Sequence, residues 1–77
     1  MNRAEAFAKG AREGHKEGQH RAGQYILGED LLAAWEASDA HGYMRNTAHA
    51  FEQGFCYGYR LACEGAELNP RILREVG

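Results

Sequence analysis

The sequence has little that would interrupt an α-helix. Only one of its 77 residues is proline, at Pro70, and proline is the residue that most strongly breaks a helix interior. β-Branched residues, which favour sheet, are also scarce: Ile26, Thr47, Ile72 and Val76. These shortages predict an all-α protein.

An excess of positive charge is missing too. The chain has 9 Lys and Arg against 11 Asp and Glu, a net charge of −2, so binding to nucleic acid by phosphate neutralisation is not expected. No apolar run is long enough to cross a membrane. The opening "MNRAEAFAKG" has no apolar core typical of a secretory signal, and we expect a cytoplasmic location. The length suits a single domain over 1–77.

Residues that carry chemistry are few and badly spaced. Cys56 and Cys63 on one helix would lie about 10 Å apart along its axis, too far for a disulfide between them. A helical metal site needs ligands three or four residues apart. That spacing is absent among the histidines, which are His15, His20, His41 and His49. We therefore predict no catalytic residue, no metal and no cofactor, and a protein that is not an enzyme.

Periodicity and capping residues divide the chain into helices. We predict helices over 3–26, 30–41 and 48–65, followed by a short one over 70–76. Gly42 is placed to end the second helix, and Asn46 or Thr47 to begin the third. The fold expected is a small three-helix bundle with a short C-terminal helix.

The second predicted helix contains the only tryptophan, Trp35. Leu31, Leu32 and Ser38 share its face at helical spacing. Since Trp35 is the bulkiest apolar side chain available, we expect this face to be buried and Trp35 to anchor the core.

Two similar stretches place small residues at every fourth position, "AFAKGAREG" from Ala6 and "AFEQGFCYG" from Ala50. Continued at the same spacing beyond the quoted letters, the two stripes are Ala6, Gly10, Gly14, Gly18 and Ala22, and Ala50, Gly54, Gly58, Ala62 and Ala66. The five glycines cost roughly 5 kcal/mol relative to alanine in a helix. Close approach of a second backbone would offset this, so we predict that the first and third helices pack through these stripes, running antiparallel. The alternatives are that one stripe stays open as a groove for a partner, or that the first helix is frayed until it binds. The 44-residue offset suggests a weak internal duplication.

The other face of the third predicted helix holds residue types that are common in binding sites. They are His49, Glu52, Cys56, Tyr59, Arg60 and Cys63. Tyrosine and arginine are enriched in interface hot spots, so this face is a candidate partner or dimer surface. The alternative is that another helix of the chain covers it.

The pattern Ala-x-x-x-Gly-x-x-x-Gly resembles the opening of ribosome modulation factor and its small relatives. In that family a helix with this spacing precedes a Pro-Tyr and a tryptophan-rich helix. Both "AFAKGAREG" and "AFEQGFCYG" match the first part, and Tyr25 and Trp35 lie roughly where the tyrosine and the first tryptophan would. This chain has no Pro-Tyr and no second tryptophan. The resemblance implies association with ribosomes or RNA.

The absence of catalytic residues leaves a binding function as the main prediction. We expect a small protein-binding module whose partner is a host protein or complex, as for phage or mobile-element proteins that inhibit host defence machinery. Two alternatives stand beside it: a ribosome- or RNA-associated modulation factor, and a homodimeric structural module.

Overall fold

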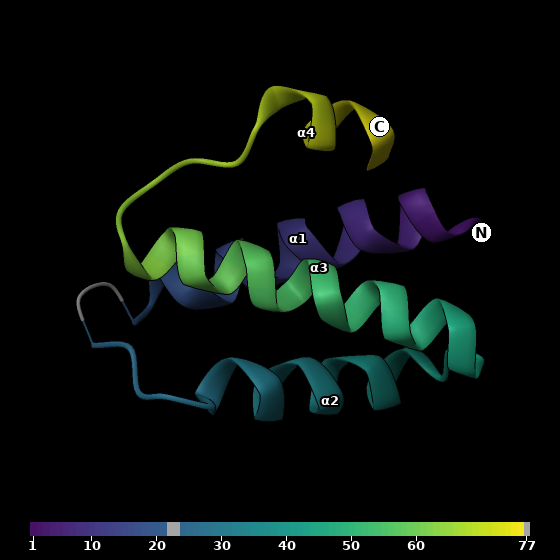
Figure 1. Cartoon of the computed structure of the whole chain (residues 1–77), viewed down its shortest axis with the longest axis horizontal. Helices are drawn as coiled ribbons and strands as arrows, with labels where there is room; N and C mark the ends of the chain where they lie inside the picture. Colours follow the sequence, from purple (N-terminus) through teal and green to yellow (C-terminus); the bar gives the residue numbers. More distant parts are fainter. Residues whose placement is uncertain (22–23, 77) are drawn as a thin grey trace.

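The computed structural model describes residues 1–21 and 24–76, and Ala22 of the first stripe lies outside them. The helices are α1 (Arg3–Gln19), α2 (Glu29–His41), α3 (Arg45–Cys63) and α4 (Pro70–Val76). No strand occurs in the described ranges. The predicted all-α bundle with a short C-terminal helix is confirmed (Figure 1).

Local sequence explains where the helices begin and end. The Asn2 side chain accepts a hydrogen bond from the Glu5 backbone N–H at 2.8 Å, forming the capping box that begins α1. Gly42 ends α2 with φ of +70°, as predicted, and Gly65 follows α3 with φ of +79°. Glycine adopts this left-handed backbone without the strain that a Cβ would cause.

Two predicted boundaries are wrong. α1 ends at Gln19 instead of Ile26, and α3 begins at Arg45 instead of residue 48. The early end of α1 has a tertiary cause. α3 ends at Cys63, which is 44 residues after Gln19 and hence the equivalent position of the second stretch. Beyond this level α1 has no helix to pack against, and the chain turns towards α2.

α1 and α3 are in backbone contact through their glycines. A Cβ built on Gly10 would lie 2.0 Å from the Phe51 carbonyl oxygen, and one on Gly54 would lie 2.0 Å from that of Phe7. A Cβ lies about 1.5 Å from its Cα, so each oxygen is within about 3.5 Å of a glycine Cα, the range of Cα–H···O contacts. The predicted packing through small-residue stripes is confirmed.

The remaining stripe residues continue the same contact. Gly14 faces the Phe55 carbonyl, Gly58 faces that of Ala11, and Gly18 lies against Tyr59 and Ala62. All five glycines are buried. The groove considered for a partner along these stripes is therefore filled within the chain.

The two helices run in the same direction, contrary to the prediction. Gly10 meets Phe51 and Gly18 meets Tyr59, so both residue numbers rise together and the helices run parallel. Figure 1 shows α1 and α3 advancing in the same direction. The prediction of an antiparallel pair was wrong because a spacing of four residues looks the same from either end.

The contact between α1 and α3 is reciprocal. Gly10 faces Phe51, while Gly54, 44 residues after Gly10, faces Phe7, 44 residues before Phe51. Gly14 with Phe55 and Gly58 with Ala11 form a second such pair. Mutual contact between equivalent positions is the pattern of a two-fold interface between identical subunits. The internal duplication suggested by the sequence thus has a structural counterpart within one chain.

The two shorter helices follow the same arrangement. α2 follows α1 in the chain but packs mainly on α3, and α4 follows α3 but packs on α1. They lie on opposite sides of the central pair (Figure 1). His41 fastens the end of α2, because its Nε2 lies 3.0 Å from the Glu13 carboxylate and its ring stacks on Tyr43 at 4.8 Å.

The predicted role of Trp35 is wrong. Trp35 is 51% exposed, and the core contains instead Phe51, Phe55 and Tyr59 from α3 with alanines from all three long helices. α2 turns Asp30, Ala34 and Ser38 inward. Small side chains let α2 approach α3, and this choice of face leaves its large apolar residues outside.

Candidate functional site

The α3 face proposed from the sequence meets the N-terminal turn of α2 at a buried carboxylate. Asp30 is fully buried and accepts a hydrogen bond at 2.7 Å from Nε of Arg60 and one at 3.1 Å from the Tyr25 hydroxyl. A position in the first turn also lets the helix dipole stabilise the negative charge. Nearby Asp30 raises the pKa of Arg60, first through the hydrogen bond and then through its charge. The ion pair thus joins α2 to α3.

Burial also keeps the two thiols and the Tyr59 hydroxyl of this face protonated. It raises the pKa of the Cys56 thiol to about 11 and, with the Glu29 carboxylate nearby, that of Tyr59 to about 12. The pKa of Cys63 is raised by burial as well, and its thiol points at the Gly18 carbonyl at 3.9 Å. Since the thiolate is the reactive form, neither thiol is activated as a nucleophile.

The six candidate binding residues differ in how far they are exposed to solvent. Tyr59 is 3% exposed and packs edge-on against Tyr25 at 6.5 Å, which makes it a core residue. Cys56 and Cys63 are half-buried at the edge of the same core, and Glu52 is also half-buried. His49 and Arg60 are exposed. α2 therefore covers part of this face. A partner surface there remains a prediction, and such a surface would have to use the exposed residues His49 and Arg60.

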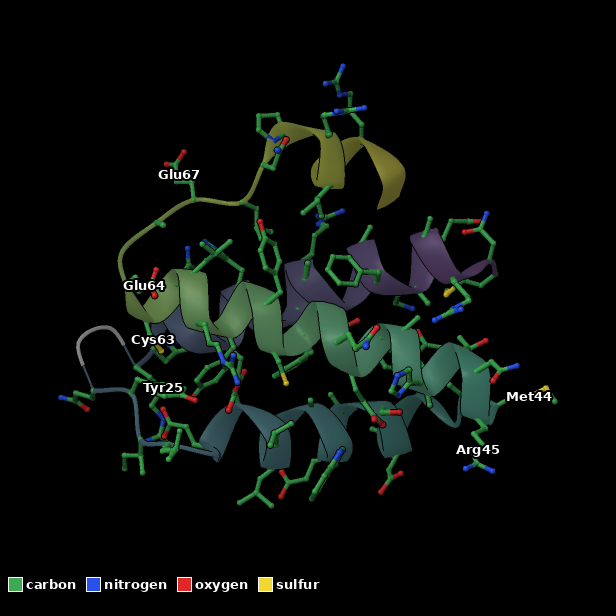
Figure 2. All side chains as sticks on the ribbon, viewed as in Figure 1. Tyr25, Met44, Arg45, Cys63, Glu64 and Glu67 are labelled. Carbon is green, nitrogen blue, oxygen red and sulfur yellow. The ribbon has the colours of Figure 1, made fainter. Side chains whose placement is uncertain are left out.

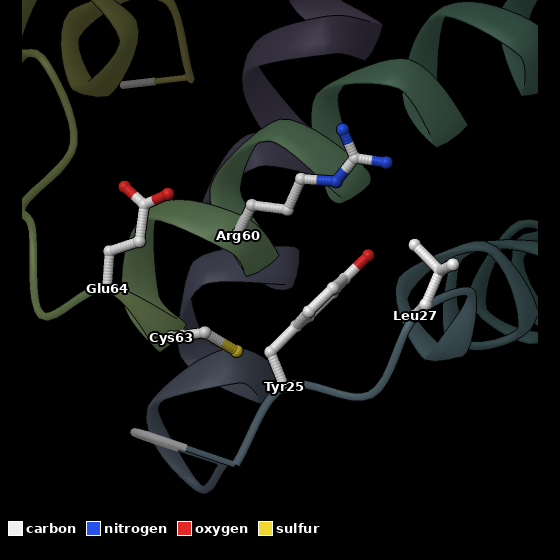
Figure 3. A pocket seen from close by; sticks show the side chains of 5 residues that line it. All are labelled: Tyr25, Leu27, Arg60, Cys63 and Glu64. Atoms are coloured by element: carbon white, nitrogen blue, oxygen red, sulfur yellow. The ribbon is translucent and has the colours of Figure 1, made fainter.

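A cavity of about 530 Å³ opens where this face ends. Its lining residues are Tyr25, Leu27, Arg60, Cys63 and Glu64. Figure 3 shows Leu27 across the opening from Cys63 and Glu64, with the Tyr25 ring between them. The volume is in the range of small-molecule sites, but the charged lining residues are one cation, Arg60, and one carboxylate, Glu64, and both are exposed.

One group of exposed apolar residues was not identified as a surface from the sequence. Leu31, Leu32 and Trp35 on the outer face of α2 are 43%, 61% and 51% exposed. Spacings of three and four residues place them side by side. The connection just before α2 adds two more exposed apolar residues, Ile26 at 64% and Leu27 at 90%. Figure 2 shows side chains of α2 directed away from the other helices.

We call Leu31, Leu32 and Trp35 the α2 outer face. The sequence analysis grouped these three residues correctly but assigned them to the core, and it wrongly placed Ser38 with them, since Ser38 is buried on the inward side of α2. The signal that would have placed them outside is the second small-residue pattern of the same helix, with Ala33, Ala34 and Ala37 beside the inward-facing Asp30.

The described residues also lack two features that would define other kinds of site. No group of three metal-ligating side chains occurs among them. No helix in the same ranges is long and apolar enough to cross a bilayer. Comparison of the chain with models of protein families, with curated proteins and with solved structures finds no match. In the residues that the structure describes, the fold is a small arrangement of four helices with a parallel central pair.

Proposed function

We propose that this chain is a non-enzymatic protein-binding module and that the α2 outer face is its contact surface. The observation that carries the proposal is the exposure of Trp35 beside Leu31 and Leu32 on a helix whose other side is fastened to α3. Contiguous exposed apolar patches on soluble proteins commonly mark interaction sites. Tryptophan is also the residue most enriched in binding hot spots.

The attachment of α2 supports a preformed surface. The Asp30–Arg60 ion pair holds its first turn, and the His41–Glu13 pair holds its last. A helix fixed at both ends loses little conformational entropy on binding, which favours affinity. A module that fills a groove on a larger host protein in this way would block that groove for other ligands, and this is the form in which an inhibitory role is proposed.

The test is affinity capture from a lysate of the source cells with three forms of the full chain. The wild type should retain one protein in stoichiometric amount, and Leu32→Ser should lose it. Met44→Ser is the matched control, because Met44 is 83% exposed and lies outside the α2 outer face. Circular dichroism checks that all three forms fold. Retention that is the same in wild type and Leu32→Ser, or no retention by the wild type, would overturn the proposal.

A further inference from the structure

The charges of α2 differ from those of every other helix. It carries Glu29, Asp30, Glu36 and Asp39, and it contains no lysine or arginine. Asp30 is fully buried, where Arg60 neutralises it, and Glu29 is half-buried with one carboxylate oxygen inside the bundle. Glu36 and Asp39 are exposed. The outer side of this helix is therefore both apolar and acidic.

The two properties are arranged in order along the helix. Trp35 and Asp39 are four residues apart, as are Leu32 and Glu36, so each acid follows an apolar residue on the same side. The apolar half lies towards the N-terminus of α2 and the acidic half towards the C-terminus.

The position of Asp39 is unfavourable within the chain itself. The carboxylate lies in the last turn of α2, where the helix dipole is negative and disfavours an anion. The described residues provide no ion pair to Asp39 or Glu36. A cation from outside would satisfy both carboxylates and the helix end together.

We propose that the partner presents an apolar groove with lysine or arginine at the end that receives the C-terminal half of α2. This inference rests on the proposed function and specifies the partner's chemistry. Amphipathic helices commonly bind in grooves by residues at such spacing. A second copy of this chain fits poorly, because a parallel pair of α2 helices would place acids against acids, an antiparallel pair would place acids against apolar residues, and α2 has no lysine or arginine to balance them.

Trp35 gives a direct test, since it is the only tryptophan and lies in the surface. Two synthetic helical peptides serve as probes, with leucine at the same positions and either lysine or glutamate at all others. Titration of the full chain with the leucine–lysine peptide should shift Trp35 emission to shorter wavelength and saturate. Its affinity should exceed that of the leucine–glutamate peptide at least tenfold and fall as salt is added.

Two double variants with equal net charge locate the effect. Glu36→Gln with Asp39→Asn should weaken binding of the leucine–lysine peptide about three- to tenfold, as expected for two exposed charge pairs. Glu5→Gln with Glu67→Gln removes two exposed acids that line no cavity with α2, and glutamine at position 5 still suits the capping box. This control should change affinity less than twofold.

Several results would overturn the inference. These are equal affinity for the two peptides, no emission shift with either, or equal weakening by the two double variants. A Trp35 shift with phosphatidylglycerol vesicles but not with the leucine–lysine peptide would assign the face to membrane binding. Sedimentation as a dimer that Leu32→Ser abolishes would assign it to a second copy. A captured protein that depends on Leu32 but not on Glu36 and Asp39 would overturn this inference alone and leave the protein-binding function standing.

Discussion

α3 is held by two neighbours in opposite ways. Towards α1 it presents glycines, and the two backbones touch with Gly54 against the Phe7 carbonyl. Towards α2 it presents aromatic side chains, which meet alanines and one ion pair. The first contact leaves no room for a methyl group, whereas the second uses small residues to turn Leu32 and Trp35 outward. Large apolar residues of this chain therefore lie both in the core, as Phe51 does, and on the surface, as Trp35 does.

The largest effect on stability should come from adding one methyl group at the contact between α1 and α3. Gly54→Ala places a Cβ 2.0 Å from a backbone oxygen, which cannot move without separating the helices. Although alanine favours helix by about 1 kcal/mol, we expect a net loss of about 3 kcal/mol or more, most of the stability of a domain this small. Urea unfolding followed by circular dichroism measures it. Gln53→Ala, exposed on the same helix, is the control, and equal midpoints for the two variants would contradict close packing.

The ion pair between α2 and α3 should give the next largest effect. Arg60→Met leaves the Asp30 carboxylate buried with only the Tyr25 hydroxyl as a side-chain partner. We expect a loss of about 2 kcal/mol, less than for a fully buried pair because water reaches Arg60, which is 58% exposed. Arg12→Met, on the exposed side of α1, should change the free energy of unfolding by less than about 0.5 kcal/mol. A similar small change for Arg60→Met would show that the pair does not hold α2.

Alkaline pH should loosen the side of α3 that α2 covers. Cys56 and Tyr59 have pKa values of about 11 and 12 in the folded chain, above their ordinary values of 9.0 and 10.0. Between these limits the unfolded chain gives up protons that the folded chain retains, so stability is full below pH 9 and falls as the pH rises. The melting temperature should therefore decline from about pH 9 to pH 12. In Cys56→Ala the decline above pH 9 should be shallower, because of the two thiols only Cys63 is left with a raised pKa, and an unchanged profile would exclude Cys56 as a source.

The smallest effect on stability should come from a substitution in the α2 outer face. Leu32→Ser removes a side chain that is 61% exposed, and we expect the free energy of unfolding to change by less than about 0.5 kcal/mol. Phe51→Ala, at a fully buried position of the core, should cost about 3–5 kcal/mol. Thermal unfolding of both variants tests the difference. A cost above 2 kcal/mol for Leu32→Ser would place Leu32 in the fold instead of on a free surface.

Much of the bundle could be predicted from local sequence. Gly42 marks the end of α2, Pro70 begins α4, and the cost of five glycines in two helices requires a close contact. The direction of that contact could not be predicted, because a spacing of four residues fits a parallel and an antiparallel pair equally well. The end of α1 was also missed, since Gln19 is the last position that α3 can cover.

The site was less predictable because both sides of α2 look like a core. Leu31 and Trp35 are large, while Ala34 and Ser38 are small, and both sets recur at helical spacing. Which set turns inward depends on how close α3 comes, and the bulky Phe55 and Tyr59 on α3 leave space only for small partners. Arg60 was identified as unusual, but its partner Asp30 lies 30 residues away and no local pattern links them.

The exchange of neighbours, with α2 on α3 and α4 on α1, has a consequence for how the chain folds. Within the first half α2 meets α1 at little more than the His41–Glu13 pair, and in the second half α4 packs on α1 instead of α3. The main contacts of the fold therefore form only when residues about forty apart have met. Such distant pairings slow folding relative to helical proteins built from neighbouring contacts. During synthesis α1 would leave the ribosome without a partner and wait for the whole of α3. The chain would then close in one cooperative step, with both halves assembling as two subunits joined by a tether.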